Sequence, residues 1–211
     1  MNFRIISLLI ILLVAITGQA QQKREKRLFD GKSFKGWEGD TLKTWSIKDG
    51  SLVGGSLTEN VPHNEFIATT KPYGNFRLRM KFRLLGSEGF INTGVQFHSR
   101  RIANPPHEMT GYQADLGDGY WGCLYDESRR DKVLAFADTN IIKRILRRND
   151  WNDYEVISEN GWIRIRLNGQ LTIDYREPDT TIPQSGLIAL QIHGGGKAEV
   201  WYKDIYITEL D

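Results

Sequence analysis

The chain has 211 residues, and 28 Lys or Arg residues nearly balance 26 Asp or Glu residues, which gives a formal net charge of +2. This balance carries no electrostatic signature of nucleic-acid binding. The single cysteine, Cys123, excludes an intramolecular disulfide, so we expect buried apolar surface to stabilise the fold and Cys123 to be a small buried thiol. Six Trp and eight Tyr residues supply rings that could stack on sugars, although most are expected in the core.

The N-terminus has the pattern of a secretory signal peptide. A short basic start precedes an almost wholly apolar stretch, residues 5–16, and the small residues Gly18 and Ala20 suit cleavage. The stretch is too short for a good membrane span, and no Cys follows the predicted cut, which argues against a lipid anchor. The sequence therefore predicts a signal peptide at residues 1–20, export to the periplasm or outside the cell, and no stable membrane anchor, with an uncleaved anchor as the alternative. Residues 21–27 are predicted to form a mobile leader, and residues 28–211 a single domain.

Alternating polar and apolar residues predict strands through the rest of the chain. In residues 76–84, apolar side chains alternate with four basic ones, as in a strand with one buried and one solvated face. Asp49-Gly50 and Asn168-Gly169 are hairpin signals, and residues 138–148 could form a short amphipathic helix. Many short strands separated by turns predict an all-β fold, a two-sheet antiparallel jelly-roll sandwich. In chain order, the predicted strands lie within residues 45–53, 76–84, 94–100, 112–116, 162–167, 171–175, 187–193 and 199–208.

Three of these runs carry polar residues on one face. Because strand side chains alternate between faces with period two, residues 94–100, 112–116 and 187–193 each separate a polar set from a mostly apolar set. A sheet face with amide, imidazole, guanidinium and carboxylate groups is more typical of a sugar-binding groove than of ordinary solvated surface. We therefore expect one cavity to collect Gln96, His98, Arg100, Gln113, Asp115, Gln191 and His193.

Two loops beside these strands add candidate binding residues. Residues 101–111 contain prolines that exclude this segment from a sheet ladder, and they carry His107 and Glu108. Residues 118–127 place three aromatic rings beside carboxylates. Loops held on a rigid sheet often carry functional groups, so both are candidates. In the second loop, the predicted substrate contacts are Tyr120, Trp121, Tyr125 and Asp126. The alternatives are that the first loop is plain surface and that the second is a hydrophobic plug.

Several familiar catalytic patterns are missing from the sequence. It contains no G-x-S-x-G, H-E-x-x-H or P-loop motif. Retaining sandwich glycosidases need paired carboxylates, whereas the polar face of the central strand offers Gln113 and Asp115, one amide and one carboxylate. His98, His193 and Asp115 could hold a divalent metal together with Gln96 or Gln191, but a hydrogen-bonded polar network is the favoured interpretation. We therefore predict no cofactor and leave a divalent metal open.

Several motifs follow one another in a recognisable order, at residues 28–37, 45–50, 92–98, 111–115, 151–152, 168–169 and 186–194. Their order resembles that of one known family, the 3-keto-disaccharide hydrolase domain family. The resemblance covers essentially the whole predicted domain and implies a concanavalin-like jelly roll, export in many bacteria, and action on glycosides oxidised to a ketone at carbon 3. Such a ketone acidifies the hydrogen on carbon 2, so a base can remove it, and the enolate then expels the aglycone from carbon 1. Water can add back afterwards.

The resemblance also implies roles for the polar-face residues. The family's usual Glu and Gln on the central strand are replaced here by Gln113 and Asp115, and its usual Arg by His98, with Arg100 two residues further on. The reaction needs a base, a donor to the enolate oxygen and an acid for the leaving group. Asp115 or His98 is the expected base, and Arg100 or His193 the expected enolate partner. The expected hydroxyl-binding amides are Gln96, Gln113 and Gln191.

The sequence thus predicts an exported carbohydrate-active enzyme that cleaves 3-keto-glycosides. Its predicted partner is a carbohydrate substrate, with no nucleic acid, and its oligomeric state is left open. The alternatives are a non-catalytic carbohydrate-binding module and a conventional glycoside hydrolase.

Overall fold

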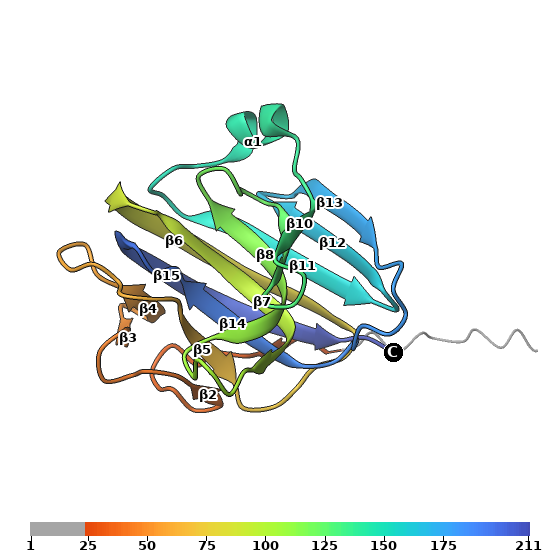
Figure 1. Cartoon of the computed structure of the whole chain (residues 1–211), viewed down its shortest axis with the longest axis horizontal. Helices are drawn as coiled ribbons and strands as arrows, with labels where there is room; N and C mark the ends of the chain where they lie inside the picture. Colours follow the sequence, from red (N-terminus) through yellow and green to blue (C-terminus); the bar gives the residue numbers. More distant parts are fainter. Residues whose placement is uncertain (1–23) are drawn as a thin grey trace, which may run out of the picture.

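A computed structural model describes residues 24–211, so the predicted signal peptide lies outside the described residues. Two antiparallel sheets pack face to face, and one short helix lies at one end of them (Figure 1). This is the predicted all-β sandwich. No helix within residues 24–211 is long and apolar enough to cross a membrane.

The larger sheet of the described chain has eight strands. Its order is β13-β12-β11-β6-β15-β4-β3, and β1 pairs with β15 outside this path. The long strands β6 and β15 run side by side through its middle (Figure 1). The strands are β1 (Lys26–Arg27), β3 (Trp45–Lys48), β4 (Ser51–Gly55), β6 (Phe76–Gly89), β11 (Asn152–Glu159), β12 (Trp162–Leu167), β13 (Gln170–Arg176) and β15 (Gly196–Glu209).

The second sheet has seven strands within residues 24–211, in the order β10-β9-β8-β7-β14-β5-β2. The predicted helix is present as α1 (Thr139–Ile145), where Asp138 accepts hydrogen bonds from two backbone N–H groups of the first turn and so caps the helix. The strands are β2 (Trp37–Glu38), β5 (Glu65–Thr69), β7 (Asn92–Arg101), β8 (Met109–Gly117), β9 (Leu124–Glu127), β10 (Lys132–Ala135) and β14 (Leu187–Ile192).

The ordered domain begins earlier than the sequence predicts. Lys26 and Arg27, assigned above to a mobile leader, pair with Ile207 and Tyr206 of β15. Glu25 adds two hydrogen bonds of 2.5 Å from the guanidinium of Arg79. The charged composition that suggested a leader is instead explained by ion pairs on the outer face of the eight-stranded sheet.

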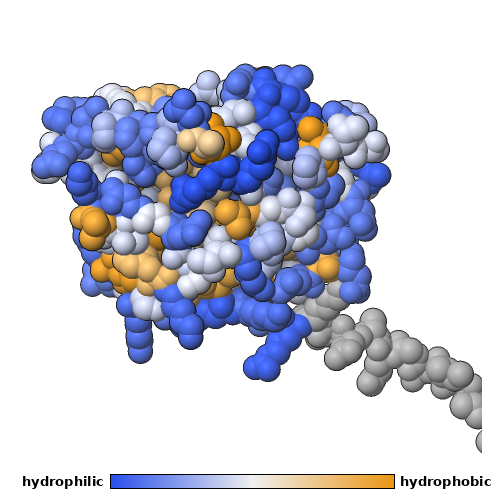
Figure 2. Space-filling view, turned by 60° about the horizontal axis from the view of Figure 1, so that its bottom comes forward, coloured by the Kyte–Doolittle hydropathy of each residue, from blue (hydrophilic) through white to orange (hydrophobic). Residues whose placement is uncertain are grey.

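Burial along β6 follows the predicted alternation. Phe76, Leu78, Met80, Phe82 and Leu84 are all less than 5% exposed and point between the sheets. The intervening basic residues face outward, and two of them donate hydrogen bonds to acids of β11, Arg77 to Glu155 and Lys81 to Asp153. Figure 2 shows a face on which hydrophilic residues predominate and hydrophobic ones form separate small groups. The core between the two sheets therefore supplies the apolar burial that holds the fold together.

Candidate active site

The outer face of the seven-stranded sheet carries three buried glutamines on neighbouring strands. Gln96 of β7 lies opposite Gln113 of β8, and Gln191 of β14 lies opposite Gly94 of β7. The Gln113 amide donates to Gln191 Oε1 at 3.1 Å and lies across Gly94, where an added Cβ would come within 2.7 Å of the Gln113 side chain. Among the described residues, Gln96 Oε1 and Gln113 Oε1 are buried without a hydrogen-bond partner. Unpaired buried acceptors are costly, so they mark a place for ligand or water.

A small cavity of about 100 Å³ opens at one end of this face. Phe90, which is 38% exposed, forms one wall, and its ring contacts His193 at 4.6 Å between centroids and Tyr120 at 6.3 Å. Tyr120 in turn contacts Tyr125 at 6.4 Å. The cavity thus combines an aromatic rim with a polar floor, and its lining consists of Phe90, Asn92, Gln113, Asp115, Tyr120, Tyr125, Glu127 and His193.

Asp115 is the most buried carboxyl of the cavity. Its side chain is 4% exposed, and Oδ1 accepts hydrogen bonds from Asn92 Nδ2 at 2.9 Å and from the Leu116 N–H at 2.8 Å. Burial raises the pKa of Asp115 to about 7, although the hydrogen bonds from Asn92 and Leu116 oppose the shift. A carboxyl with a pKa near neutrality can both take and return a proton under physiological conditions, which is what a general base requires.

Glu127 is a second carboxyl in the cavity and was not among the predicted site residues. Burial raises its pKa to about 8, and the negative charges of Glu108, Asp115 and Asp131 add to the effect. In β9, Tyr125 lies opposite Gln113, so Tyr125 and Glu127 share the outer face while Leu124 is buried inside. The alternation of residues 124–127 contained this signal, because an inward Leu124 requires an outward Glu127.

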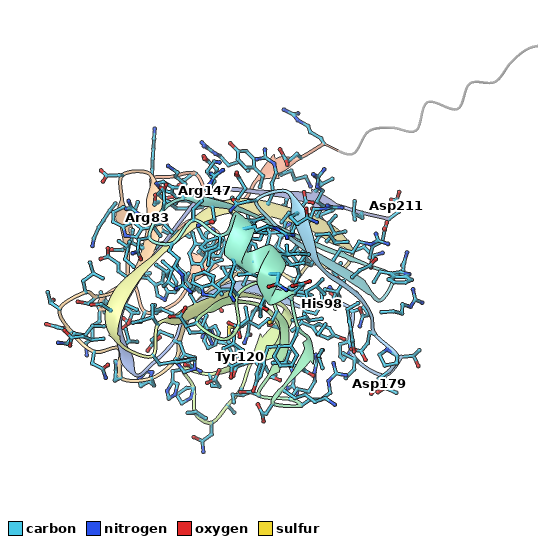
Figure 3. The ribbon with its side chains drawn as sticks, turned by 90° about the horizontal axis from the view of Figure 1, so that it is seen from above. Arg83, His98, Tyr120, Arg147, Asp179 and Asp211 are labelled. Carbon is cyan, nitrogen blue, oxygen red and sulfur yellow. The ribbon has the colours of Figure 1, made fainter. Side chains whose placement is uncertain are left out.

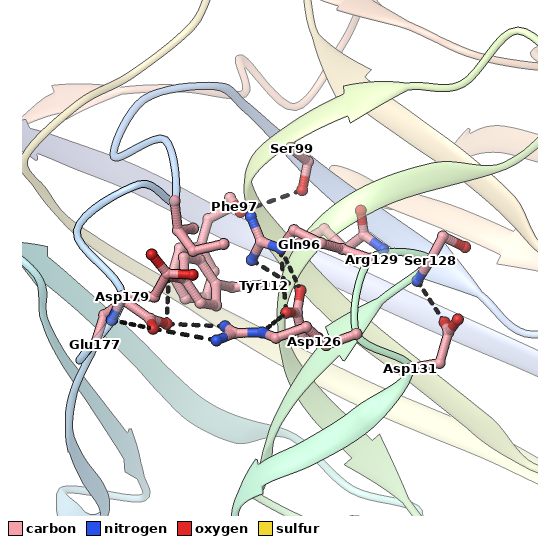
Figure 4. Close-up of polar contacts among 12 residues, drawn as sticks. Gln96, Phe97, Ser99, Tyr112, Asp126, Ser128, Arg129, Asp131, Glu177 and Asp179 are labelled. Atoms are coloured by element: carbon pink, nitrogen blue, oxygen red, sulfur yellow. Dashed lines mark hydrogen bonds and ion pairs between the residues drawn. The ribbon is translucent and has the colours of Figure 1, made fainter.

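Asp126 lies on the opposite side of β9, and its predicted contact with substrate is wrong. It is fully buried between the sheets, where Arg129 Nε donates to its Oδ1 at 2.8 Å and Arg130 contacts its other oxygen (Figure 4). Arg130 also pairs with Glu177 at 2.8 Å, and Tyr112 donates its hydroxyl hydrogen to Glu177 at 2.7 Å. This network joins β8 and β9 to the segment that follows β13. Asp126 is therefore an anchor of the fold.

A β-bulge in β7 moves His98 and Arg100 away from the predicted face. Phe97 pairs with Tyr112 and Arg100 pairs with Thr110, so two residues of β7 lie opposite Gly111 alone, and His98 has a positive φ of 47°. An extra residue changes the alternation beyond it. Arg100 consequently lies in register with Thr110, and Arg101 takes the outer face in register with Met109.

His98 instead packs on the core side. Its ring lies 5.8 Å from that of Phe76 and 5.5 Å from that of Phe97, and its Nε2–H donates to the Gly74 carbonyl at 3.1 Å. Burial lowers the pKa of His98 to about 4, so the imidazole is neutral near pH 7. Figure 3 shows the molecule from the α1 side, with His98 and Tyr120 labelled at separate places in the sandwich. His98 is therefore not placed with Asp115, as the strand alternation predicted.

The two predicted loops contribute unequally. Trp121 turns inward, stacks on Phe82 of the other sheet at 6.4 Å and donates its N–H to Asp118, so its predicted place at the substrate is wrong. Glu108 borders the cavity rather than lining it. Its oxygens accept from Asn64 Nδ2 at 3.1 Å and from the Met109 N–H at 2.9 Å. Its charge nevertheless reaches Glu127 and raises that pKa.

His107 belongs to a separate groove at the other end of the face. Its ring stacks on His63 at 3.8 Å, and the groove is also lined by Glu65 and Arg101. Of the seven side chains expected in one cavity, Gln113, Asp115 and His193 line it. Gln96 and Gln191 lie on the same face but are fully buried outside the cavity lining, and His98 and Arg100 leave that face. No group of three or more His, Cys, Asp or Glu side chains within residues 24–211 is arranged to hold a metal ion, and His98 lies on the wrong side of β7 to join Asp115 and His193.

Comparison with known proteins agrees with the architecture. The sequence profile of the 3-keto-alpha-glucoside-1,2-lyase-like domain matches residues 24–208, whereas a search of curated proteins gave no match. A candidate glycosyl hydrolase from Parabacteroides distasonis ATCC 8503 is 22% identical with a TM-score of 0.65, covering 89% of this chain and 94% of its own. The carbohydrate-binding module CBM66 from Bacillus subtilis is 16% identical with a TM-score of 0.64, covering 82% and 96%. A Bacillus licheniformis beta-glucanase is 10% identical with a TM-score of 0.53, covering 92% and 100%. These likenesses establish the concanavalin-like jelly-roll fold.

Proposed function

Because the chain belongs to the 3-keto-alpha-glucoside-1,2-lyase-like family, we propose that it cleaves 3-keto-glycosides by removing the proton from carbon 2, next to the ketone. Family membership supports a carbohydrate-active enzyme, and the geometry adds a reason for this reaction. The observation that carries the proposal is Asp115, a carboxyl that is 4% exposed, opens into a polar cavity and has a pKa raised to about 7.

Asp115 acts as the base in this proposal. Its carboxylate takes the proton from carbon 2, and negative charge develops on the ketone oxygen at carbon 3. His193 lines the same cavity, and its Nδ1–H donates to the Gly194 carbonyl at 2.6 Å, so it donates to the enolate oxygen through Nε2 in its imidazolium form. The enolate then re-forms the ketone and expels the aglycone from carbon 1, leaving a double bond between carbons 1 and 2. Addition of water across this double bond completes hydrolysis, and its omission makes the reaction an elimination.

Substrate binding uses the amides and the aromatic rim. Gln113 presents an unpaired acceptor to the cavity, and Gln96 and Gln191 support it from the neighbouring strands. Phe90, Tyr120 and Tyr125 offer ring faces and edges to the apolar side of a sugar. Because the cavity measures only about 100 Å³, we propose that it holds a single sugar residue at a chain end. We also propose that the protein is exported, on the basis of residues 1–20.

The test compares oxidised and unoxidised substrates. The purified protein is incubated with 3-keto-glucosides and with the parent glucosides, with and without a chelator, and release of the aglycone is measured. We expect release from the oxidised substrates only. Asp115→Asn should abolish turnover, because the amide cannot accept the proton, while the melting temperature at acidic pH, where the wild-type Asp115 carries its proton, stays within a few degrees. Undiminished turnover by this variant would remove Asp115 from the mechanism.

Two other functions have specific support and are decided by the same assay. The likeness to the module CBM66 favours a non-catalytic carbohydrate-binding protein, which would bind ordinary glycans and release no product from a keto-glycoside. The pairing of Asp115 with Glu127 in one cavity supplies two carboxyls, which a conventional glycoside hydrolase needs. Release of nitrophenol from an unoxidised glycoside would favour that enzyme.

A further inference from the structure

We propose that Glu127 is a catalytic residue of this cavity, the acid that protonates the oxygen of the departing aglycone. The inference rests on the proposed function and extends it to the second half of the reaction. Alkoxide leaving groups are poor, so cleavage of a sugar–sugar bond needs a proton donor at the glycosidic oxygen as well as a base at carbon 2.

The position of Glu127 suits a group acting across the sugar from Asp115. Gln113 and Tyr125 are directly opposite each other on β8 and β9. Asp115 lies two residues beyond this pair in one direction, and Glu127 lies two residues beyond it in the other. The two Cα atoms are therefore about 14 Å apart along the strands. Their side chains share one face and line one cavity, which leaves the space above Gln113 for the reacting sugar.

The surroundings of Glu127 keep a proton on it when Asp115 is ionised. Glu127 is half-buried, and the carboxyls of Glu108, Asp115 and Asp131 all disfavour its negative charge. Burial raises the pKa of both carboxyls, and the negative charge of Asp115 raises the pKa of Glu127 further. Glu127 therefore keeps its proton when Asp115 is ionised, which is the pairing of acid and base that the reaction requires.

The proton balance of the cycle closes on these two groups. Asp115 gains the proton from carbon 2, the bond between carbon 1 and the glycosidic oxygen breaks, and that oxygen takes the proton of Glu127. The Glu127 carboxylate then removes a proton from the water that adds to carbon 1, and Asp115 returns its proton to carbon 2. Both groups end in their starting states, and the net reaction is hydrolysis. If product leaves before water adds, exchange with solvent restores them.

Leaving-group dependence distinguishes this role from a structural one. The nitrophenolate of a nitrophenyl 3-keto-glucoside departs without protonation, whereas the sugar that leaves a 3-keto-disaccharide must be protonated as it departs. We expect Glu127→Gln to lose roughly 10²–10⁴-fold in kcat/KM on the disaccharide, the contribution typical of a general acid, and far less on the nitrophenyl substrate. The control is Glu88→Gln, which removes an exposed carboxyl that pairs with Lys197 at the end of β6 and should change neither rate.

The wild-type pH profile tests the same inference without a variant and covers the case in which Glu127→Gln fails to fold. Activity on the disaccharide should fall as pH rises through about 8, where Glu127 loses its proton, and this fall should be missing with the nitrophenyl substrate. Equal losses on both substrates, no loss on either, or identical alkaline profiles would overturn the role of Glu127 while the proposed function stands. If the wild-type protein cleaves neither oxidised substrate, both proposals fall.

Discussion

Replacing Asp126 by Asn should destabilise the fold, because two partly buried arginines lose the carboxylate that neutralises them. Asp126 is fully buried against Arg129 and Arg130, whose side chains are 20% and 22% exposed. Removing one partner of a buried ion pair costs about 3–5 kcal/mol. Arg130 keeps its pairing with Glu177, so we expect the lower end of this range. With a urea dependence of about 2 kcal/mol per molar, a loss of about 3 kcal/mol lowers the unfolding midpoint by roughly 1.5 M.

The assay is urea unfolding at neutral pH, and the matched control is Glu127→Gln on the same strand. The side chain of Glu127 faces the cavity, and its raised pKa means that the protonated form, which the amide resembles, is already favoured. We expect its free energy of unfolding to stay within about 1 kcal/mol of wild type. An Asp126→Asn loss below about 1 kcal/mol, or an equal loss for Glu127→Gln, would refute the assignment of the two carboxyls to opposite faces.

Two further predictions concern buried titratable groups. Burial raises the pKa of Asp115 from 3.8 to about 7, so the folded protein holds this proton more tightly than the unfolded chain. The stability that this proton contributes is complete below about pH 4 and is lost as pH rises through about 7. Asparagine does not titrate, so the free energy of unfolding of Asp115→Asn should increase relative to that of wild type when both are measured first at about pH 4 and then at about pH 8. An unchanged difference would contradict the raised pKa. His98→Leu should lower the free energy of unfolding by about 1 kcal/mol through the lost bond to Gly74, and leave kcat/KM on a 3-keto-glycoside unaltered. A large fall in kcat with full stability would return His98 to the reaction.

Strand alternation made most of the architecture predictable. The period-two pattern of residues 76–84 identified both faces of β6, and Asn168-Gly169 marked the turn between β12 and β13. The same rule placed Gln113, Asp115 and Gln191 on one face, because β8 and β14 have no bulge between these positions. Where the ladder is regular, a list of alternate residues is also a list of neighbours in space.

The sequence assigned His98 and Arg100 to the wrong face for a local reason. The bulge at His98 requires a positive φ at a residue other than glycine, and residues 95–100 contain no glycine or proline that would have predicted it. Every residue beyond the bulge therefore lies on the face opposite to the predicted one, so Arg101 and not Arg100 lies on the outer face. The prediction for Asp126 failed for a different reason. A carboxylate beside aromatic residues in a loop suggests contact with substrate, and only the folded chain brings Arg129 and Arg130 over it.

The ion pairs of Asp126 with Arg129 and Arg130 also affect the end of β9 that carries Glu127. This strand has only four residues and lies near one border of its sheet, where backbone fraying is common. The inward carboxyl fastens the strand to the connection after β13, so the outward carboxyl of Glu127 receives its orientation during folding. The ordering cost is thus met before a sugar arrives, and the cavity is preorganised for its ligand.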